Sequence, residues 1–255
     1  MIDTHAHIYT KEFKDDLPGI ISNCRTSGIE KILMPNVDHD SIDLMFAVEE
    51  KYPEMCISMM GLHPSSVDKH IQKQLYEVEG WLEKRSFIAV GEIGIDLYWD
   101  KSFKDLQEEA FRVQVGFAKK HNLPIVIHCR NAFEETIAIV EELHDGALTG
   151  VFHCFAGSAE EAARVTNLGF FLGIGGVATF KNGGLDKVIP EISLQHIVLE
   201  TDSPYLAPAP YRGKRNEPGY LPVIAQKIGD LKQIPINEVA EATTNNAEKL
   251  FRLIK

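Results

Sequence analysis

The stretch Pro124-Ile125-Val126-Ile127-His128 is apolar at every position before its closing histidine. Strands covered by other elements on both faces have this uninterrupted pattern, which is typical of parallel sheets. Similar runs, rich in β-branched residues, recur along the chain and predict eight strands. These runs cover residues 1–5, 31–37, 55–63, 87–94, 124–129, 150–155, 170–176 and 196–202.

Segments with helical periodicity lie between the predicted strands. Residues 103–121 are one example, with apolar side chains at Leu106, Ala110, Val113, Phe117 and Ala118, and residues 131–143 are another. This alternation predicts an α/β fold with a parallel sheet and crossover helices. Eight strands favour closure into a (β/α)8 TIM barrel, with an open doubly wound sheet as the competing fold.

The chain of 255 residues fits one barrel, so we expect residues 1–255 to form a single domain, although two domains remain open. No apolar run approaches the ~20 residues that a membrane-spanning helix needs, and the N-terminus does not resemble a signal peptide. We therefore expect a cytoplasmic protein without a membrane partner, and the sequence gives no reason to infer an obligate protein partner.

The formal net charge of −11 argues against a broad nucleic-acid-binding surface, because sequence-independent affinity for phosphates comes mainly from Lys and Arg. A local site remains open. Bound divalent cations can be the largest charges in a pocket, so an acidic protein can still bind a phosphodiester there.

His5 and His7 lie two positions apart at the end of the first predicted strand. Side chains at that spacing point to the same face and can share a metal, although a histidine pair that caps the barrel is the alternative. Further metal-competent side chains fall at or near the C-terminal ends of other predicted strands, where barrel enzymes build their active sites. These are Glu92, His128, His153 and Asp202.

Together these side chains predict a metal site at the C-terminal rim of the barrel. Imidazoles and carboxylates suit Zn, Mn, Co or Fe, whereas a pure Mg or Ca site favours an all-oxygen shell; Mg itself stays open. The set suits one or two divalent ions, with Glu92 as the bridge between two, although a strand-end salt bridge is an alternative role for that residue. Such a centre lowers the pKa of a bound water, and Asp202 could accept the proton.

Other candidates concern substrate contacts. Glu200 should face the same way as Asp202, in a direct, supporting or packing role. His63 ends the third run and could contact substrate or stabilise its turn. Arg130 could bind phosphate or cap the next helix, and Tyr98 with Trp99 could stack on a base or pack within their loop.

One long loop, residues 203–220, follows the last predicted strand and contains Arg212, Lys214 and Arg215. These clustered cations could hold a phosphate backbone, with a solvated loop as the alternative.

Five motifs carry a family resemblance: Asp3-Thr-His-Ala-His7, Val90-Gly-Glu-Ile-Gly-Ile-Asp96, Leu123-Pro-Ile-Val-Ile-His-Cys-Arg130, Phe152-His-Cys-Phe-Ala-Gly-Ser158 and Glu200-Thr-Asp-Ser-Pro-Tyr-Leu-Ala-Pro208. The sequence resembles the TatD family of deoxyribonucleases from residue 2 to residue 251. The resemblance implies a binuclear metal centre on the matching residues His5, His7, Glu92, His128, His153 and Asp202.

The activity implied by the resemblance is metal-dependent hydrolysis of DNA phosphodiesters, as a 3′–5′ exonuclease on single strands. A shared barrel does not fix the substrate. Hydrolysis of carbonyl esters or amides, such as D-aminoacyl-tRNA, is the alternative, and a metal-containing scaffold without turnover is a third reading.

Overall fold

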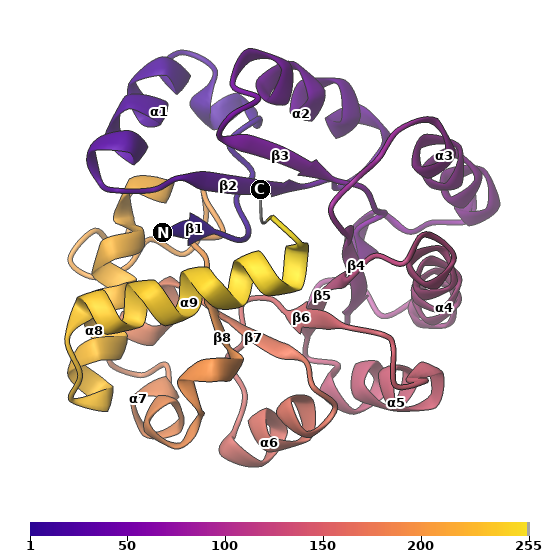
Figure 1. Ribbon diagram of the computed structural model, residues 1–255. Helices are drawn as coiled ribbons and strands as arrows, with labels where there is room; N and C mark the ends of the chain where they lie inside the picture. Colours follow the sequence, from indigo (N-terminus) through magenta and orange to yellow (C-terminus); the bar gives the residue numbers. More distant parts are fainter. Residues whose placement is uncertain (254–255) are drawn as a thin grey trace.

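The computed structural model describes residues 1–253, and within them eight parallel strands alternate with helices (Figure 1). The strands are β1 (Ile2–Asp3), β2 (Lys31–Pro35), β3 (Cys56–Met59), β4 (Val90–Asp96), β5 (Ile125–Arg130), β6 (Gly150–Phe152), β7 (Phe171–Ile174) and β8 (Ile197–Leu199). The α-helices are α1 (Leu17–Thr26), α2 (His39–Lys51), α3 (Ile71–Lys84), α4 (Lys104–His121), α5 (Phe133–Leu143), α6 (Ala159–Asn167), α7 (Leu185–Val188), α8 (Leu221–Lys232) and α9 (Ile236–Phe251). Short 3-10 helices are η1 (Lys11–Phe13), η2 (Pro64–Ser66), η3 (Gly176–Thr179), η4 (Ile189–Glu191), η5 (Leu194–His196) and η6 (Pro218–Tyr220).

The strands close into a barrel. Regular pairing gives one sheet in the order β1-β2-β3 and another in the order β4-β5-β6-β7-β8. At one seam the Gly91 amide donates to the Met60 carbonyl at 3.0 Å. At the other, the Thr4 amide donates to the Leu199 carbonyl at 3.0 Å and the Asp202 amide to the His5 carbonyl at 2.9 Å. The predicted (β/α)8 barrel is therefore confirmed over the open sheet.

An apolar layer, the barrel floor, fills the interior near the start of the strands. Each strand or its flank supplies one buried side chain: Ile2, Leu33, Met59, Ala89, Val126, Val151, Phe171 and Val198. Leu250 and Phe251 at the end of α9 pack against this layer. Figure 1 shows α9, in yellow, lying across this end of the barrel. The floor is sealed by a helix, so polar chemistry is confined to the opposite rim.

Each predicted run overlaps one of the eight strands, and most runs extend beyond their strand, whereas β4 and β5 end two residues and one residue after their runs. The third run reaches residue 63, whereas β3 ends at Met59, and the last run reaches residue 202, whereas β8 ends at Leu199. At the rim the chain leaves the hydrogen-bonded sheet while its residues stay buried. Amino-acid composition alone therefore does not show where the strands end. The helices predicted over 103–121 and 131–143 correspond to α4 and α5.

Among the residues described, no helix has both the length and the apolarity needed to cross a membrane.

Candidate metal centre

The inner face of the barrel becomes polar one layer above the floor. His128, His153 and Glu200 each follow a floor residue of their own strand by two positions, and the strand repeat turns them to the same inner face. At this level β7 contributes Gly173, where an added Cβ would lie 2.1 Å from Glu200 Oε2. The missing side chain of Gly173 is thus what makes room for the buried carboxylate.

Glu92 of β4 lies at the centre of the site, with its side chain only 3% exposed. Its Oε1 atom lies 2.7 Å from His128 Nδ1 and 2.9 Å from His153 Nε2. Its Oε2 atom lies 3.0 Å from His5 Nε2 and 3.6 Å from His7 Nε2. The two oxygens therefore face two separate pairs of imidazoles, which is the arrangement expected of a carboxylate between two cations.

The charge of Glu92 is set by these neighbours. Burial alone would raise its pKa, but interaction with the imidazoles of His153, His63 and His5 outweighs burial and holds the pKa of Glu92 well below its usual range. The carboxylate is consequently an anion at neutral pH and has two oxygens available as ligands.

Asp202, which follows β8, completes the group of side chains around Glu92. Its Oδ1 atom lies 3.9 Å from His5 Nε2 and 3.7 Å from His7 Nε2, and its side chain is 14% exposed. The residue has left-handed backbone geometry, with φ at 56°, which Asp tolerates better than most residues. Burial, with a further contribution from Glu92, raises the pKa of Asp202 to about 7.

The first-strand histidines are neutral. Burial lowers the pKa of His5 to about 4 and that of His7 to about 3. The Tyr9 hydroxyl donates to the Pro35 carbonyl at 2.6 Å, so it must accept from His7 Nδ1–H, at 2.8 Å. His7 therefore keeps its proton on Nδ1 and turns the lone pair of Nε2 towards Glu92.

His128 and His153 are held by carboxylates on their outer sides. His128 Nε2 donates to Asp96 Oδ2 at 2.9 Å, and His153 Nδ1 lies 3.3 Å from Glu200 Oε1. Burial opposes protonation of both rings, but the carboxylates outweigh it and raise the pKa of each. The inner nitrogen of each ring, which faces Glu92, then carries a proton at the position a metal cation would take.

The donor atoms of these residues, imidazole nitrogens and carboxylate oxygens, fit one or more metal ions. An outer acceptor on an imidazole, with the inner nitrogen facing the centre, is the usual arrangement around metal-binding histidines. Potential ligand atoms lie within 4.8 Å of one another in three overlapping triads: His5, His153 and Asp202; His5, His7 and Glu92; His63, Glu92 and His128.

His63 differs from the other histidines at the site. The Ser65 amide donates to His63 Nδ1 at 3.1 Å, so in the neutral ring the proton lies on Nε2. That nitrogen faces the centre, 3.3 Å from Glu92 Oε1 and 3.2 Å from His128 Nδ1. His63 is thus better suited to donate a hydrogen bond than to ligate a metal, although it completes one of the triads.

Sequence reasoning missed three buried residues that support the site: Tyr9, Asp96 and Asp3. Asp3 accepts from the Thr201 hydroxyl at 2.6 Å and from the Thr201 amide at 2.9 Å, and burial raises its pKa to about 8. This contact fastens β1 to the end of β8. Asp96 had a detectable signal, because it lies four positions after Glu92 and hence on the same face of β4.

The predicted cations differ in how they are held. Arg215 pairs bidentately with Asp16, at 2.6 and 2.9 Å, and lies over the ring of Phe13, so its guanidinium is already engaged. Arg212 stacks on Phe180, 3.6 Å from the ring centroid, and Lys214 is exposed. Arg130 lies at the end of β5, two residues beyond His128.

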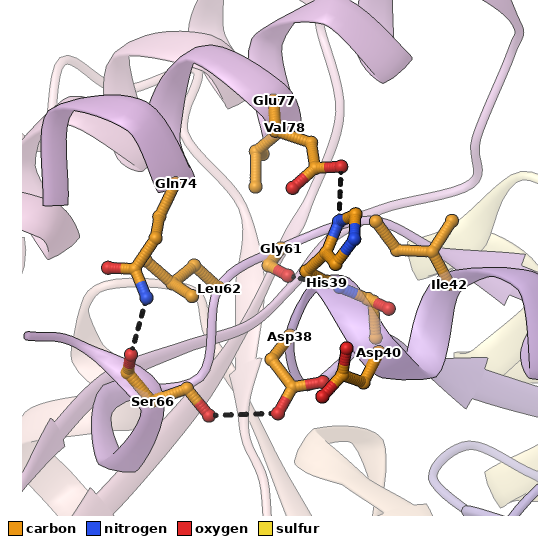
Figure 2. Close-up of a pocket in the computed structure, with 11 residues that line it drawn as sticks. Asp38, His39, Asp40, Ile42, Gly61, Leu62, Ser66, Gln74, Glu77 and Val78 are labelled. Carbon is orange, nitrogen blue, oxygen red and sulfur yellow. Dashed lines mark hydrogen bonds and ion pairs between the residues drawn. The ribbon is translucent and has the colours of Figure 1, made fainter. Parts of the chain in front are cut away.

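A cavity of about 300 Å³ lies between the loops after β2 and β3 and helix α3, and Figure 2 shows the side chains around it. Three carboxylates line it, from Asp38, Asp40 and Glu77. Asp38 caps α2 through the Ser41 amide, and Glu77 pairs with His39 at 2.6 Å. This side of the rim is therefore acidic and unfavourable for a polyanion.

A model of the family described as TatD related DNase matches residues 2–252. The chain is 38% identical to the metal-dependent hydrolase YabD of Bacillus subtilis over 254 residues, covering 99% of both proteins. It is 30% identical to the 3′-5′ ssDNA/RNA exonuclease TatD of Edwardsiella piscicida, covering 99% of this chain and 100% of the relative.

A solved structure has the same fold. The crystal structure of YjjV, a TatD homologue from Escherichia coli K12, superposes with a TM-score of 0.93 at 29% identity, covering 99% of this chain and 98% of that one.

Proposed function

The chain belongs to the family of TatD-related DNases, and we propose that this metal-dependent hydrolase removes nucleotides from the 3′ ends of single-stranded DNA. The observation that carries the proposal is Glu92, whose two oxygens face two pairs of imidazoles deep in the rim. Relatives named as 3′-5′ ssDNA/RNA exonucleases support the choice of substrate.

We propose that Glu92 bridges two metal ions. His5, His7 and Asp202 would hold one beside Oε2, and His128 and His153 the other beside Oε1. When bound, such ions acidify water and stabilise negative charge on phosphoryl oxygens. Imidazole ligands favour Zn or Mn, with Mg as a further candidate.

Asp202 is the proposed general base. Its Oδ1 atom lies 3.7 Å from His7 Nε2, so the carboxylate is next to the proposed metal ions and to a water that they would bind. With 14% of the side chain exposed, Asp202 can also exchange a proton with solvent.

Recognition of phosphate is proposed for side chains around the opening. His63 directs its Nε2–H inward and can donate to a phosphate oxygen. Arg212 and Lys214 after β8 and Arg130 at the end of β5 supply positive charge, and the carboxylates of Figure 2 would repel the strand from the segment after β2 and from α3. Arg215, held by Asp16, would instead fasten the loop to the segment before α1, and Glu200 would orient His153.

The direct test uses untagged protein with measured metal content. Single-stranded DNA labelled at the 3′ or the 5′ end is incubated with and without chelator, and with added Zn, Mn or Mg. Stepwise, chelator-sensitive loss from the 3′ end is expected. Bound metal without DNA cleavage, together with hydrolysis of an aminoacyl ester, would replace the proposal with the carbonyl-hydrolase alternative.

A second test addresses the loop cations. Replacing Arg212 and Lys214 together by Ala should raise KM for DNA. It should also reduce the slope of the logarithm of the binding constant against the logarithm of the salt concentration, by the amount expected for the loss of about one to two phosphate contacts. The matched control is Lys51→Ala with Lys249→Ala, two exposed lysines on α2 and α9. Equal KM and salt dependence in both double variants would remove the loop from the proposal.

A further inference from the structure

Exposed large apolar side chains gather at the rim. Among residues 1–253, those more than about a third exposed are Leu44, Tyr76, Tyr98, Trp99, Tyr205 and Leu206. Four of these six lie on the loops that follow β4 and β8, beside the metal centre. Exposed apolar groups concentrated around an opening indicate contact with a ligand rather than chance exposure.

Trp99 is the most exposed side chain of the rim group, at 74%, and Tyr98 is half-exposed. The two rings meet edge to face, with centroids 4.8 Å apart and planes at 90°. The Arg130 guanidinium lies over the Tyr98 ring, 3.8 Å from its centroid. Loop packing therefore accounts for Tyr98, which lies against both neighbours, but leaves most of the Trp99 indole open to solvent.

Arg130 has unused hydrogen-bonding capacity. Within the described part of the chain, six of the eight arginines donate to a carboxylate or carbonyl oxygen: Arg25, Arg85, Arg112, Arg164, Arg215 and Arg252. In residues 1–253, the guanidinium groups of Arg130 and Arg212, both on the rim, lie over aromatic rings and donate to no carboxylate or carbonyl oxygen. Stacking fixes the plane of the Arg130 guanidinium while leaving its N–H groups free for an anion.

The aromatic pair is tied to the metal centre by one carboxylate. Asp96 accepts from the Tyr98 amide at 2.9 Å through Oδ1, and from His128 Nε2 at 2.9 Å through Oδ2. The Leu97 amide donates to the Arg130 carbonyl at 2.9 Å, so the loop and the end of β5 are joined as well. A ligand on this surface would be held at a fixed position relative to His128.

We propose that Trp99, Tyr98 and Arg130 form a nucleotide subsite, in which a base stacks on the Trp99 indole and Arg130 binds the adjoining phosphate. The inference rests on the proposed function, which supplies the phosphodiester at the metal centre. Base–aromatic stacking tolerates every base, so the subsite selects unpaired strands without selecting sequence.

Tryptophan fluorescence tests the stacking directly. The chain has two tryptophans, and Trp81→Phe leaves Trp99 as the sole emitter. A short phosphorothioate oligodeoxynucleotide, which resists hydrolysis, should quench the emission of this variant. The same backbone without bases should quench it little, because it offers no ring to stack. Equal quenching by both oligomers, or by neither, would overturn the subsite.

Kinetics supply the second test. Removing the base next to the scissile bond should raise KM of the wild type by roughly 5- to 150-fold. In Trp99→Ala the same removal should change KM by less than about twofold, since the stacking partner is already gone. Trp99→Phe should recover part of the difference. The matched control is Tyr76→Ala, an exposed aromatic of α3 that should behave as wild type.

The two proposals fail in different ways. Quenching by the base-containing oligomer without cleavage of any DNA would leave the subsite standing and reject the nuclease. Cleavage of DNA with equal base dependence in the wild type and in Trp99→Ala would keep the nuclease and reject the subsite.

Discussion

At the rim of this barrel, the position of a single proton on each imidazole determines which role the histidine can take. Tyr9 holds the proton of His7 on Nδ1, and Asp96 accepts the outer proton of His128. Ser65 does the opposite for His63, because its amide takes up the lone pair of Nδ1 and leaves a donor facing inward. Histidines that look alike in the sequence therefore suit different roles, ligand in one case and hydrogen-bond donor in the other.

Asp202→Asn should keep most of the bound metal and lose most of the turnover. Other side chains would still hold the ions, whereas the amide cannot accept a proton, so kcat should fall about 10²- to 10⁴-fold. Metal content and kcat on single-stranded DNA are the measurements, with Asp186→Asn on the exposed face of α7 as the control. Undiminished turnover would refute the role of Asp202 as general base.

Asp96→Ala should weaken metal binding. Without this acceptor the outer N–H of His128 is unpaired, and loss of such a partner lowers metal affinity about 10- to 100-fold. Asp96→Asn retains an acceptor oxygen and should lose less. Competition with a chromophoric chelator measures the affinities, and an Asp96→Ala protein with wild-type affinity would show that Asp96 does not position the ring.

At the scale of elements, the strands and their rim residues could be predicted because two simple signals coincide. Continuous apolar runs mark strands buried on both faces, and the two-residue repeat carries side chains such as His128 and His153 inward. Asp96 was missed because the predicted fourth strand ended at residue 94, two positions short of the end of β4. Its partner also depends on the register between β4 and β5, which pairs Gly94 with His128 and which no local pattern encodes.

The face of α4 was predicted only in part. Ala110 and Ala118 are fully buried as expected, whereas Leu106, Val113 and Phe117 are half-buried, and Phe111 and Val115 occupy the centre of the packed face. A helix with apolar residues on a wide arc does not show which part of the arc meets the sheet. The packing of α9 against the barrel floor likewise depends on tertiary contacts far apart in sequence.

Gly173→Ala should disturb the site from within β7. Its Cβ would lie 2.1 Å from Glu200 Oε2 and 3.1 Å from the backbone of His153, so the carboxylate must move. Overpacking of this kind costs about 1 to 3 kcal/mol of unfolding free energy, which urea denaturation measures, and metal affinity should fall with it.

The control is Gly116→Ala on α4, where an added Cβ meets nothing within 4 Å. That variant should gain about 0.5 to 1 kcal/mol, because Ala favours the helix. Equal stability changes in the two variants would mean that Gly173 does not serve to accommodate Glu200.

Across the whole molecule, the distribution of charge matters more than its sum. The chain carries a net charge of −11, yet Arg130 lies at the end of β5 and Arg212 and Lys214 follow β8, whereas the carboxylates of Figure 2 lie in the segment after β2 and on α3. An anionic strand would be drawn to the segments that carry these cations and repelled by the segments that carry the carboxylates. A global charge count therefore argues against a broad binding surface without arguing against this site.

Metal binding should stabilise the whole fold, and more strongly as pH rises. Carboxylates raise the pKa of His128 and His153 above the ordinary 6.5, so their inner protons compete with a metal until the pH exceeds those raised values. Affinity therefore falls on acidification, and binding releases protons.

Because a ligand of the native state stabilises it in proportion to the logarithm of its affinity, the metal-induced rise in Tm should be larger at pH 8 than at pH 6. Calorimetric titration in buffers of different ionisation enthalpy counts the protons released. No proton release, together with a pH-independent shift in Tm, would mean that His128 and His153 are not ligands.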